Sequence, residues 1–371
     1  MLLEFIDVIS ESITGRTPHP EDAIFAGSEA AAQQINNLKA VIANPAGVTI
    51  KWDGYPALIF GRLENGQIGI ADKYMFDRGV LVQSPDEWMK YDSQKPAGGL
   101  RGTLYDAAAV LWPGLNAAVQ GPGFYWADLM YSSKLTPTNG VYSFKPNLVE
   151  YRVAVNSPLG KIIGNSTAGV VVHQYFNKVG APPVPWNGAG LKNVPGGVAI
   201  IPPTAGNKYT LKTPVQQERA AITALRTYGA AVDALLGSLP QTTRDKIKTY
   251  FNKRITGQVN QPLHTWLENQ ISAKQYNILV GAENNGLLFT QDSHGETIES
   301  PAYVGLKTIW NAIYAFKQSI AKQLESQTTG IEEFVNGQPA GEGFVFPTPA
   351  GMVKIVDREM FSAGLFAKMA Q

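Results

Sequence analysis

Lys51 and Asp53 are the first residues whose types and spacing could do chemistry. They lie two positions apart in "TIKWDGYPALIFGR", a largely apolar run over residues 49–62, and Gly54 follows them directly. A lysine that is partly removed from water loses its proton more readily and can attack a carbonyl carbon or phosphorus. Gly54 would let a ligand approach the backbone closely. The alternative is a surface lysine followed by a turn, because K-x-D-G alone is a short and common pattern.

Three more charged residues lie in β-rich segments far along the chain. Asp128 is in "FYWADLMY", Glu342 is in "GEGFVF" and Lys354 is in "MVKIVD". Aromatic and β-branched residues dominate these segments, which favours strands.

In this order, the four segments resemble motifs I, III, IV and V of the covalent nucleotidyltransferase superfamily. That superfamily contains the ATP-dependent RNA and DNA ligases and the mRNA capping enzymes. The segments "NLVEYRVAV" and "AGVVVHQYF" lie where the strands of motif IIIa belong. Over nearly its whole length the chain also resembles an uncharacterised family of proteins from large tailed phages. That second resemblance rests on "KWDGYPA", "ADL", "FKPN", "GVVVH", "EGFV" and "VKIVDREMFS".

The superfamily resemblance implies an RNA-type polynucleotide ligase that uses ATP and Mg²⁺. The lysine would attack the α-phosphorus of ATP and form a lysyl-AMP intermediate. The AMP would pass to a 5′-phosphate end, and a 3′-hydroxyl would then displace it and seal the strand. The implied catalytic residues are Lys51, Asp53, Glu342 and Lys354. Asp53 would support the site, Lys354 would neutralise the α-phosphate, and Asp128 and Glu342 would bind Mg²⁺ or orient the ribose and the lysine.

The resemblance also implies contacts between the nucleotide and residues close to these motifs. Arg62 and Lys73 would contact phosphate or ribose, with a solvated cation at a strand end as the alternative. The backbone groups of Thr49 and Ile50 would meet the edge of the adenine.

One aromatic side chain would stack on the adenine. Tyr151 is the first candidate, and Tyr175 and Phe144 are the alternatives. A role in core packing alone is open for all three. Glu150 and His173 would either face the pocket or be satisfied by structural hydrogen bonds.

The chain departs from the superfamily pattern at several positions. Pro56 stands where many ligases have an arginine, Asp128 replaces the more usual glutamate, and Lys354 is not followed by a second lysine. Only 13 residues follow Arg358, so we expect no C-terminal OB-fold. These departures leave open RNA capping or protein adenylylation on the same fold, or a non-enzymatic phage protein that binds nucleotide or nucleic acid.

Periodicity predicts an α+β fold, and the resemblance implies a nucleotidyltransferase (ATP-grasp-like) fold of antiparallel sheets flanked by helices. We expect a helix that begins with Ser28 as its N-cap, a hairpin turn at Asn65-Gly66 and helical texture from about residue 213. The predicted strands and hairpins cover residues 48–72, 123–131, 147–155, 168–176 and 341–357, and the predicted loop region covers 177–206.

The predicted domains are a nucleotidyltransferase domain of residues 1–206 and 331–371 and a helical insert of residues 207–330. Within residues 205–254 the chain has nine Lys or Arg and three acids, about +6 on a chain whose formal net charge is +1. Such an excess favours contact with a phosphate backbone, with a solvated amphipathic face as the alternative. The superfamily resemblance implies that the nucleic acid is RNA more than DNA.

Composition narrows the classes of protein and of functional site that remain possible. Hydrophobic residues make up 44% and charged residues 16%, enough for a sizeable core. The chain has no cysteine and only four histidines at scattered positions, which excludes thiol chemistry and favours Mg²⁺ over zinc as any metal. We expect neither a signal peptide nor a membrane span, and place the protein in the cytoplasm, that of the host cell if a phage encodes it.

Overall fold

The chain folds into two units of mixed helix and sheet structure, which confirms the prediction of an α+β fold. The computed structural model describes residues 19–94, 101–280, 286–292, 294, 296–328, 330–339, 341–348 and 351–358. The helical unit holds the described parts of 19–48, 209–327 and 343–358, and the sheet unit holds those of 49–208 and 328–342.

The two units differ in membership from the domains expected from the sequence. The helical unit begins its long segment at Tyr209, close to the expected position 207. It also includes α2 (Ser28–Ala43) and the β14–β15 hairpin (Phe344–Thr348 and Gly351–Ile355), which the sequence grouped with the β-rich part. These segments join the helices because α2 packs along α7 (Val215–Ser238), and α2 and α11 (Pro301–Glu325) both contact β15.

Short elements complete the helical unit. They are η1 (Pro20–Ala26), η2 (Pro45–Gly47), α8 (Gln241–Ile255), α9 (Leu263–Glu268), α10 (Ala273–Val280), β10 (Phe289–Gln291) and β11 (Thr297–Glu299). No helix among the described residues is both long and apolar enough to span a bilayer.

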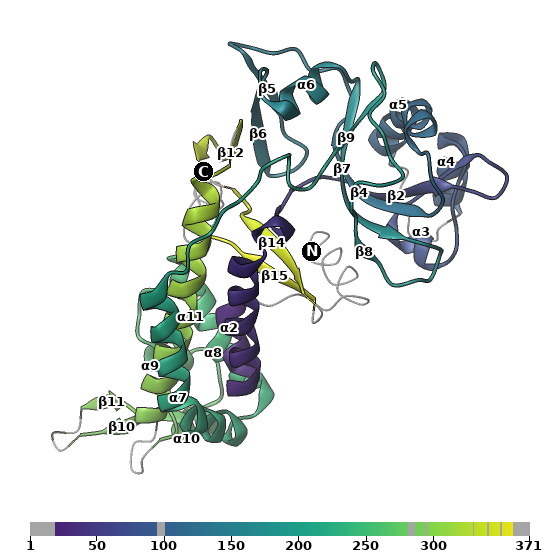
Figure 1. Cartoon of the computed structure of the whole chain (residues 1–371). Helices are drawn as coiled ribbons and strands as arrows, with labels where there is room; N and C mark the ends of the chain where they lie inside the picture. The colour runs from purple at the N-terminus through teal and green to yellow at the C-terminus, as the bar shows by residue number, and fades with distance from the viewer. Residues whose placement is uncertain are drawn as a thin grey trace. The chain divides into compact units, whose positions relative to one another are not determined.

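Helices α2, α7 and α11 lie side by side in the helical unit (Figure 1). A Cβ on Gly305 of α11 would lie 2.8 Å from Cβ of Tyr228 on α7, so only glycine permits this approach. Ser28 donates its backbone N–H to Asp233 of α7 over 2.7 Å. The predicted N-cap role of Ser28 is therefore wrong: Gly27, with φ of 115°, is the N-cap, and Ser28 is the first helical residue.

A cluster of buried charges lies where η1, α11 and the residues after β15 meet. Glu21 and Lys317 are fully buried and form an ion pair of 2.7 Å. Arg358 donates from Nη1 to the same carboxylate oxygen over 3.1 Å and lies 3.5 Å from Asp22. Asp22 in turn accepts from the indole N–H of Trp310 over 3.0 Å. The cluster therefore ties the start of the described chain to its end.

His19 borders this cluster and gives the first testable prediction. Burial lowers the pKa of His19 from 6.5 to about 2, against the opposing effect of Glu21. Below pH 6.5, His19 binds a proton in the unfolded chain but not in the folded chain. The free energy of unfolding therefore falls as the pH drops below 6.5. We expect urea unfolding to show that His19 lowers the free energy of unfolding by about 1.4 kcal/mol at pH 5.5 relative to pH 7.5.

A His19→Gln variant isolates this effect because glutamine does not titrate. The variant should lose about 1.4 kcal/mol less than the native chain over the same pH interval. Equal losses in both proteins would show that His19 is protonated normally in the fold.

Within its described residues, the sheet unit contains two sheets, four helices and the separate short strand β1. Its strands are β1 (Thr49–Ile50), β2 (Ala57–Arg62), β3 (Ile68–Ala71), β4 (Phe124–Tyr131), β5 (Val141–Phe144), β6 (Val149–Ala154), β7 (Ala168–Phe176), β8 (Val184–Pro185), β9 (Val198–Ile201), β12 (Ile331–Val335) and β13 (Gln338–Pro339). Its helices are α3 (Lys73–Asp77), α4 (Pro85–Ser93), α5 (Gly102–Ala118) and α6 (Pro158–Gly164).

The larger sheet has the strand order β3-β2-β4-β7-β8, with β9 parallel to β7 and all other pairs antiparallel. Alternate residues of β4, namely Tyr125, Ala127 and Leu129, join a hydrophobic core that α5 closes with Leu111 and Leu115. Figure 1 shows α5 beside this sheet. The β4 side chains at the positions between Tyr125, Ala127 and Leu129 therefore lie on the opposite face of the sheet.

The smaller sheet has the order β13-β12-β6-β5. Strand β12 was missing from our sequence-based prediction although it ends at Asn336-Gly337, a strong hairpin signal. Both turn residues have positive φ, 51° and 77°. The hairpin brings Glu333 directly opposite Tyr151 of β6.

Several local predictions are confirmed and others are wrong. The Asn65-Gly66 turn joins β2 to β3, and strands β4, β6 and β7 lie within the predicted ranges. The predicted loop over 177–206 contains β8 and β9. Lys73 is not on a strand, because Asp72 accepts from the backbone N–H of Met75 over 2.8 Å and so caps helix α3 at Lys73.

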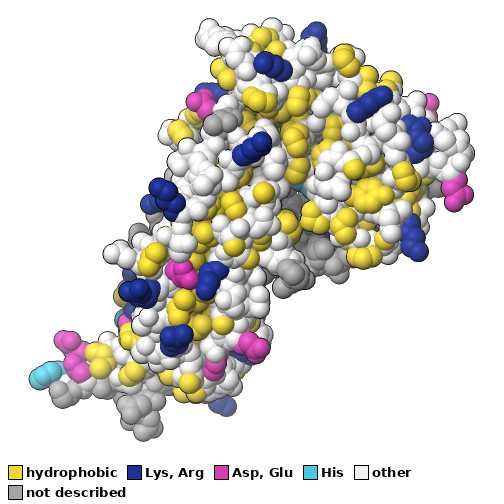
Figure 2. Space-filling view, viewed as in Figure 1, with side chains coloured by type: hydrophobic (Ala, Val, Ile, Leu, Met, Phe, Trp, Pro, Cys, Tyr) yellow, Lys and Arg dark blue, Asp and Glu magenta, His cyan; other side chains and the backbone are white. Residues whose placement is uncertain are grey.

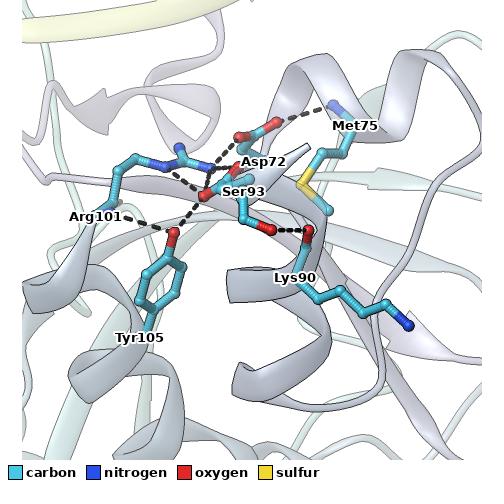
Figure 3. A network of polar contacts seen from close by, with 7 residues as sticks. Asp72, Met75, Lys90, Ser93, Arg101 and Tyr105 are labelled. Atoms are coloured by element: carbon cyan, nitrogen blue, oxygen red, sulfur yellow. Dashed lines mark hydrogen bonds and ion pairs between the residues drawn. The ribbon is translucent and has the colours of Figure 1, made fainter. Parts of the chain in front are cut away.

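A polar network holds α3, α4 and α5 together (Figure 3). Arg101 donates to Asp92 from Nε and Nη2, each over 2.9 Å, and from Nη2 to Asp72 over 3.0 Å. Tyr105 donates to Asp92 over 2.8 Å. Asp92 is almost fully buried, so these charge-assisted bonds compensate a carboxylate that burial would otherwise destabilise. The network supports the helical cover of the larger sheet.

Candidate functional site

Lys51 and Glu342, far apart in sequence, form an ion pair within the sheet unit. Lys51 follows the two-residue strand β1, and its side chain is 33% exposed, whereas that of Glu342 is 10% exposed. The lysine is therefore reachable from solvent while its carboxylate partner is largely covered. The expectation that Lys51 lies inside a longer strand is wrong, because residues 51–54 form no regular secondary structure.

Asp53 explains why the chain leaves the strand here. Its carboxylate accepts from the backbone N–H groups of Leu148 and Val149 over 2.7 and 3.0 Å, and from the Asn147 side chain over 2.8 Å. Its own backbone N–H donates to the Tyr151 hydroxyl over 2.7 Å. Asp53 thus fixes the lysine-bearing loop to β6 and to the residues that precede it.

Gly54 brings this loop against strand β4. A Cβ at position 54 would lie 2.3 Å from Cβ of Asp128 and 3.1 Å from the carbonyl oxygen of Leu129. The next residue, Tyr55, donates its N–H to that same carbonyl over 3.0 Å. Asp128 therefore lies directly beside the loop that carries Lys51.

Asp128 is paired with His173 on the face of the larger sheet opposite the core. His173 Nε2 lies 2.9 Å from Asp128 Oδ2. Gln174 pairs with Trp126 and Val172 with Ala127, so His173 is the extra residue of a β-bulge. Bulges redirect side chains, and this one brings the imidazole to the carboxylate. One of the two roles left open for His173, a hydrogen-bonded partner in the sheet, is thus observed.

Lys73 lies on the same side of the sheet unit. Its ammonium is 5.3 Å from the centre of the Trp126 ring, two residues before Asp128 on β4. Burial lowers the pKa of Lys73, and Asp77 opposes that shift. Lys73 therefore remains a candidate for phosphate contact, from a helix start and not from a strand.

Tyr151 is a packing residue in this structure. It is fully buried, and its ring lies 4.9 Å from Trp52 and 5.6 Å from Phe144 between ring centres. Burial raises the pKa of Tyr151 well above its ordinary value. Neither Tyr151 nor the equally buried Phe144 has an exposed ring face for the expected contact with adenine.

Arg62 and the strand before Lys51 also have structural partners. The guanidinium of Arg62 donates to the carbonyls of Gly66, Asn116 and Val119 over 2.6 to 2.8 Å. It therefore joins the β2–β3 turn to the end of α5, in place of the phosphate or ribose contact expected for it. The backbone N–H of Ile50 donates to the Pro203 carbonyl over 3.0 Å, and the neighbouring Thr49 is half-buried.

Lys354 is the one implied catalytic residue that lies in the helical unit. It is half-buried on β15, where it pairs in register with Val345 of β14. It also lies close enough to His19 to contribute, as the smallest of several causes, to the low pKa of that residue.

Comparison with known proteins places the whole chain in one family. The sequence matches the profile of DUF6267, a family of unknown function, over residues 17–369. The chain belongs to this family. No curated protein matches it, and no solved structure matches it. The family membership covers both units, and the chemistry of the site must be argued from its residues.

The carboxylates of this DUF6267 site do not form a ready metal centre by themselves. Within the described ranges, no three His, Asp or Glu side chains are grouped closely enough to hold an ion. Glu333 is an acid near the site that the sequence analysis missed: a Cβ on Gly341 would lie 1.7 Å from its carboxylate, next to Glu342. The hairpin signal Asn336-Gly337, directly after "IEEFV", was the signal that could have found it.

Gly54→Ala tests the close approach of the lysine loop to β4. The added Cβ meets both Asp128 and backbone, so the loop must shift, and overpacking of this kind costs about 1–3 kcal/mol. We expect a lower denaturation midpoint and a displaced Lys51. Gly102→Ala is the matched control, since a Cβ there meets nothing within 4 Å; equal midpoints for both variants would contradict the described packing.

Proposed function

We propose that the protein is an ATP-dependent polynucleotide ligase of the RNA type, acting through a lysyl-AMP intermediate on Lys51. The observation that carries the proposal is the ion pair between Lys51 and Glu342. A solvent-accessible lysine beside a largely buried carboxylate, held by the Asp53 anchor, is suited to nucleophilic attack. On this proposal the sheet unit has a nucleotidyltransferase fold, for which its antiparallel sheets are suitable.

The first step needs a neutral amine. Glu342 is placed to accept the proton that the Lys51 ammonium loses. The bond from Lys51 Nζ to the α-phosphorus forms as the bond from that phosphorus to the bridging oxygen breaks, and the electron pair leaves with pyrophosphate. Such in-line displacement depends mainly on positioning and charge balance. The loop residues Asp53 and Gly54 supply the positioning by fixing the backbone on either side of the site.

Mg²⁺ fits this donor set when it arrives with the nucleotide. Mg²⁺ is commonly held by one or two carboxylates together with substrate phosphates and water. Glu342 and Asp128 would be those carboxylates, and Asp128 Oδ1 has no hydrogen bond to a described residue. Bound there, the ion would neutralise charge on the departing pyrophosphate.

The helical unit would supply a surface for the nucleic acid. Arg219 and Arg226 are both exposed and lie seven residues apart on α7, on one face. Figure 2 shows Lys and Arg side chains on the visible face of the helical unit, interspersed with Asp and Glu side chains. The exposed pair Arg219 and Arg226 suits a phosphate backbone that is held without sequence selection.

Glu342→Gln tests the assigned proton acceptor. The amide keeps the size of the side chain but cannot take the lysine proton, so the single-turnover rate of adduct formation should fall by about 10²-fold. Glu332→Gln, at an exposed position of β12, is the control. An unchanged rate for Glu342→Gln would remove this residue from the mechanism.

Intact-mass measurement with each of the four ribonucleoside triphosphates and Mg²⁺ tests the function. We expect a gain of one AMP with ATP, followed by joining of 5′-phosphate and 3′-hydroxyl RNA ends. A guanylyl adduct and a capped, unjoined product would show a different nucleotidyl transfer. Nucleotide binding with no adduct from any triphosphate would contradict an enzymatic role.

A further inference from the structure

His173, the partner of Asp128, offers a ligand contact that the proposed reaction does not use. A carboxylate only accepts hydrogen bonds, so the 2.9 Å contact requires the proton on His173 Nε2. In the neutral ring Nδ1 is then an acceptor. Nδ1 has no hydrogen bond within the part of the chain that the structure describes, and the His173 side chain is 27% exposed.

A fixed acceptor recognises a donor on the ligand. The triphosphate of a nucleotide supplies acceptor oxygens, whereas its ribose hydroxyls can donate. The ribose adjoins the α-phosphate at which Lys51 would react. Gly54, three residues after Lys51, lies against Asp128, so the imidazole is near the part of the nucleotide that follows the reacting phosphorus.

We propose that His173 accepts a hydrogen bond from a ribose hydroxyl of the bound nucleotide, and that Asp128 positions it by fixing its tautomer. His173 would thereby select ribonucleotides over deoxyribonucleotides in the first step. This inference rests on the proposed function and adds to it a determinant of substrate class. The bulge in β7 provides the geometry, because it brings His173 to the Asp128 side of the sheet.

The test compares single-turnover adduct formation on the full chain with ATP, 2′-deoxy-ATP and 3′-deoxy-ATP. We expect the native protein to prefer ATP over at least one deoxy analogue by about tenfold, the effect of one hydrogen bond. His173→Phe should react with ATP and that analogue at nearly equal rates. His294→Phe, the same change at an exposed histidine, should keep the native preference.

A preference for ATP that survives in His173→Phe would overturn the proposal, as would equal native rates with all three nucleotides. The second comparison uses the native protein alone, so the proposal stays testable if the variant fails to fold. Adducts without ribose preference overturn only this inference. The absence of any adduct in the native protein overturns the proposed function and this inference with it.

Discussion

Lys51→Arg is expected to form no nucleotide adduct. Arginine keeps the positive charge beside Glu342 but cannot lose its proton at accessible pH, so it supplies no nucleophile. The rate of adduct formation should fall by more than about 10⁴-fold, beyond detection by intact mass after incubation with ATP and Mg²⁺. The conserved charge should keep the fold, which the denaturation midpoint checks.

Lys161→Arg provides the matched control. Lys161 is an exposed lysine of the same unit, on α6, and its replacement should leave the adduct unchanged. An adduct in Lys51→Arg equal to the native one would mean that another lysine, or no lysine, carries the nucleotide.

Glu21→Gln is expected to be the most destabilising change in the helical unit. It leaves the fully buried ammonium of Lys317 without its carboxylate and also removes a partner of Arg358. Breaking a buried pair by removing one member costs about 3–5 kcal/mol, a large part of the 5–15 kcal/mol that is typical of a whole domain. Chemical denaturation measures this loss directly.

The pH dependence gives a second measure of the same contact. Burial raises the pKa of Glu21, but Lys317, His19 and Arg358 outweigh it and lower the pKa from 4.5 to about 2. The stabilisation is therefore complete above pH 4.5 and is lost as the pH falls toward 2. Glu29→Gln, at an exposed position of α2, should change stability by less than about 0.5 kcal/mol; a similarly small loss for Glu21→Gln would contradict the buried pair.

The elements that the sequence predicted well are those with strong local signals. Strands β4 and β7 have aromatic and β-branched runs, the β2–β3 turn has Asn-Gly, and α7 and α11 have long apolar periodicity. The prediction of short elements failed because tertiary contacts, and not local sequence, determine where those elements begin and end. The loop at Lys51 leaves its strand because Asp53 bonds to β6, and helix α3, which the sequence analysis did not predict, begins at Lys73 because Asp72 caps it.

One contact of the candidate site could be predicted from the sequence, whereas the surroundings of most other candidate residues could not. The motif order correctly associated Lys51 with Glu342. Ring burial and the partners of a guanidinium cannot be read from a local pattern, so Tyr151 and Arg62 were given ligand contacts where the structure has core packing and backbone hydrogen bonds. The pairing of Asp128 with His173 depends on a bulge in β7, and no local sequence pattern predicted that bulge.

Peptide mapping of the protein after incubation with ATP and Mg²⁺ tests the central claim most directly. We predict that one AMP is attached through a phosphoramidate to the peptide that contains Lys51, and that added pyrophosphate removes it by reversing the step. AMP on a different residue, or no AMP on protein that binds ATP, would contradict the assignment of Lys51 as the nucleophile.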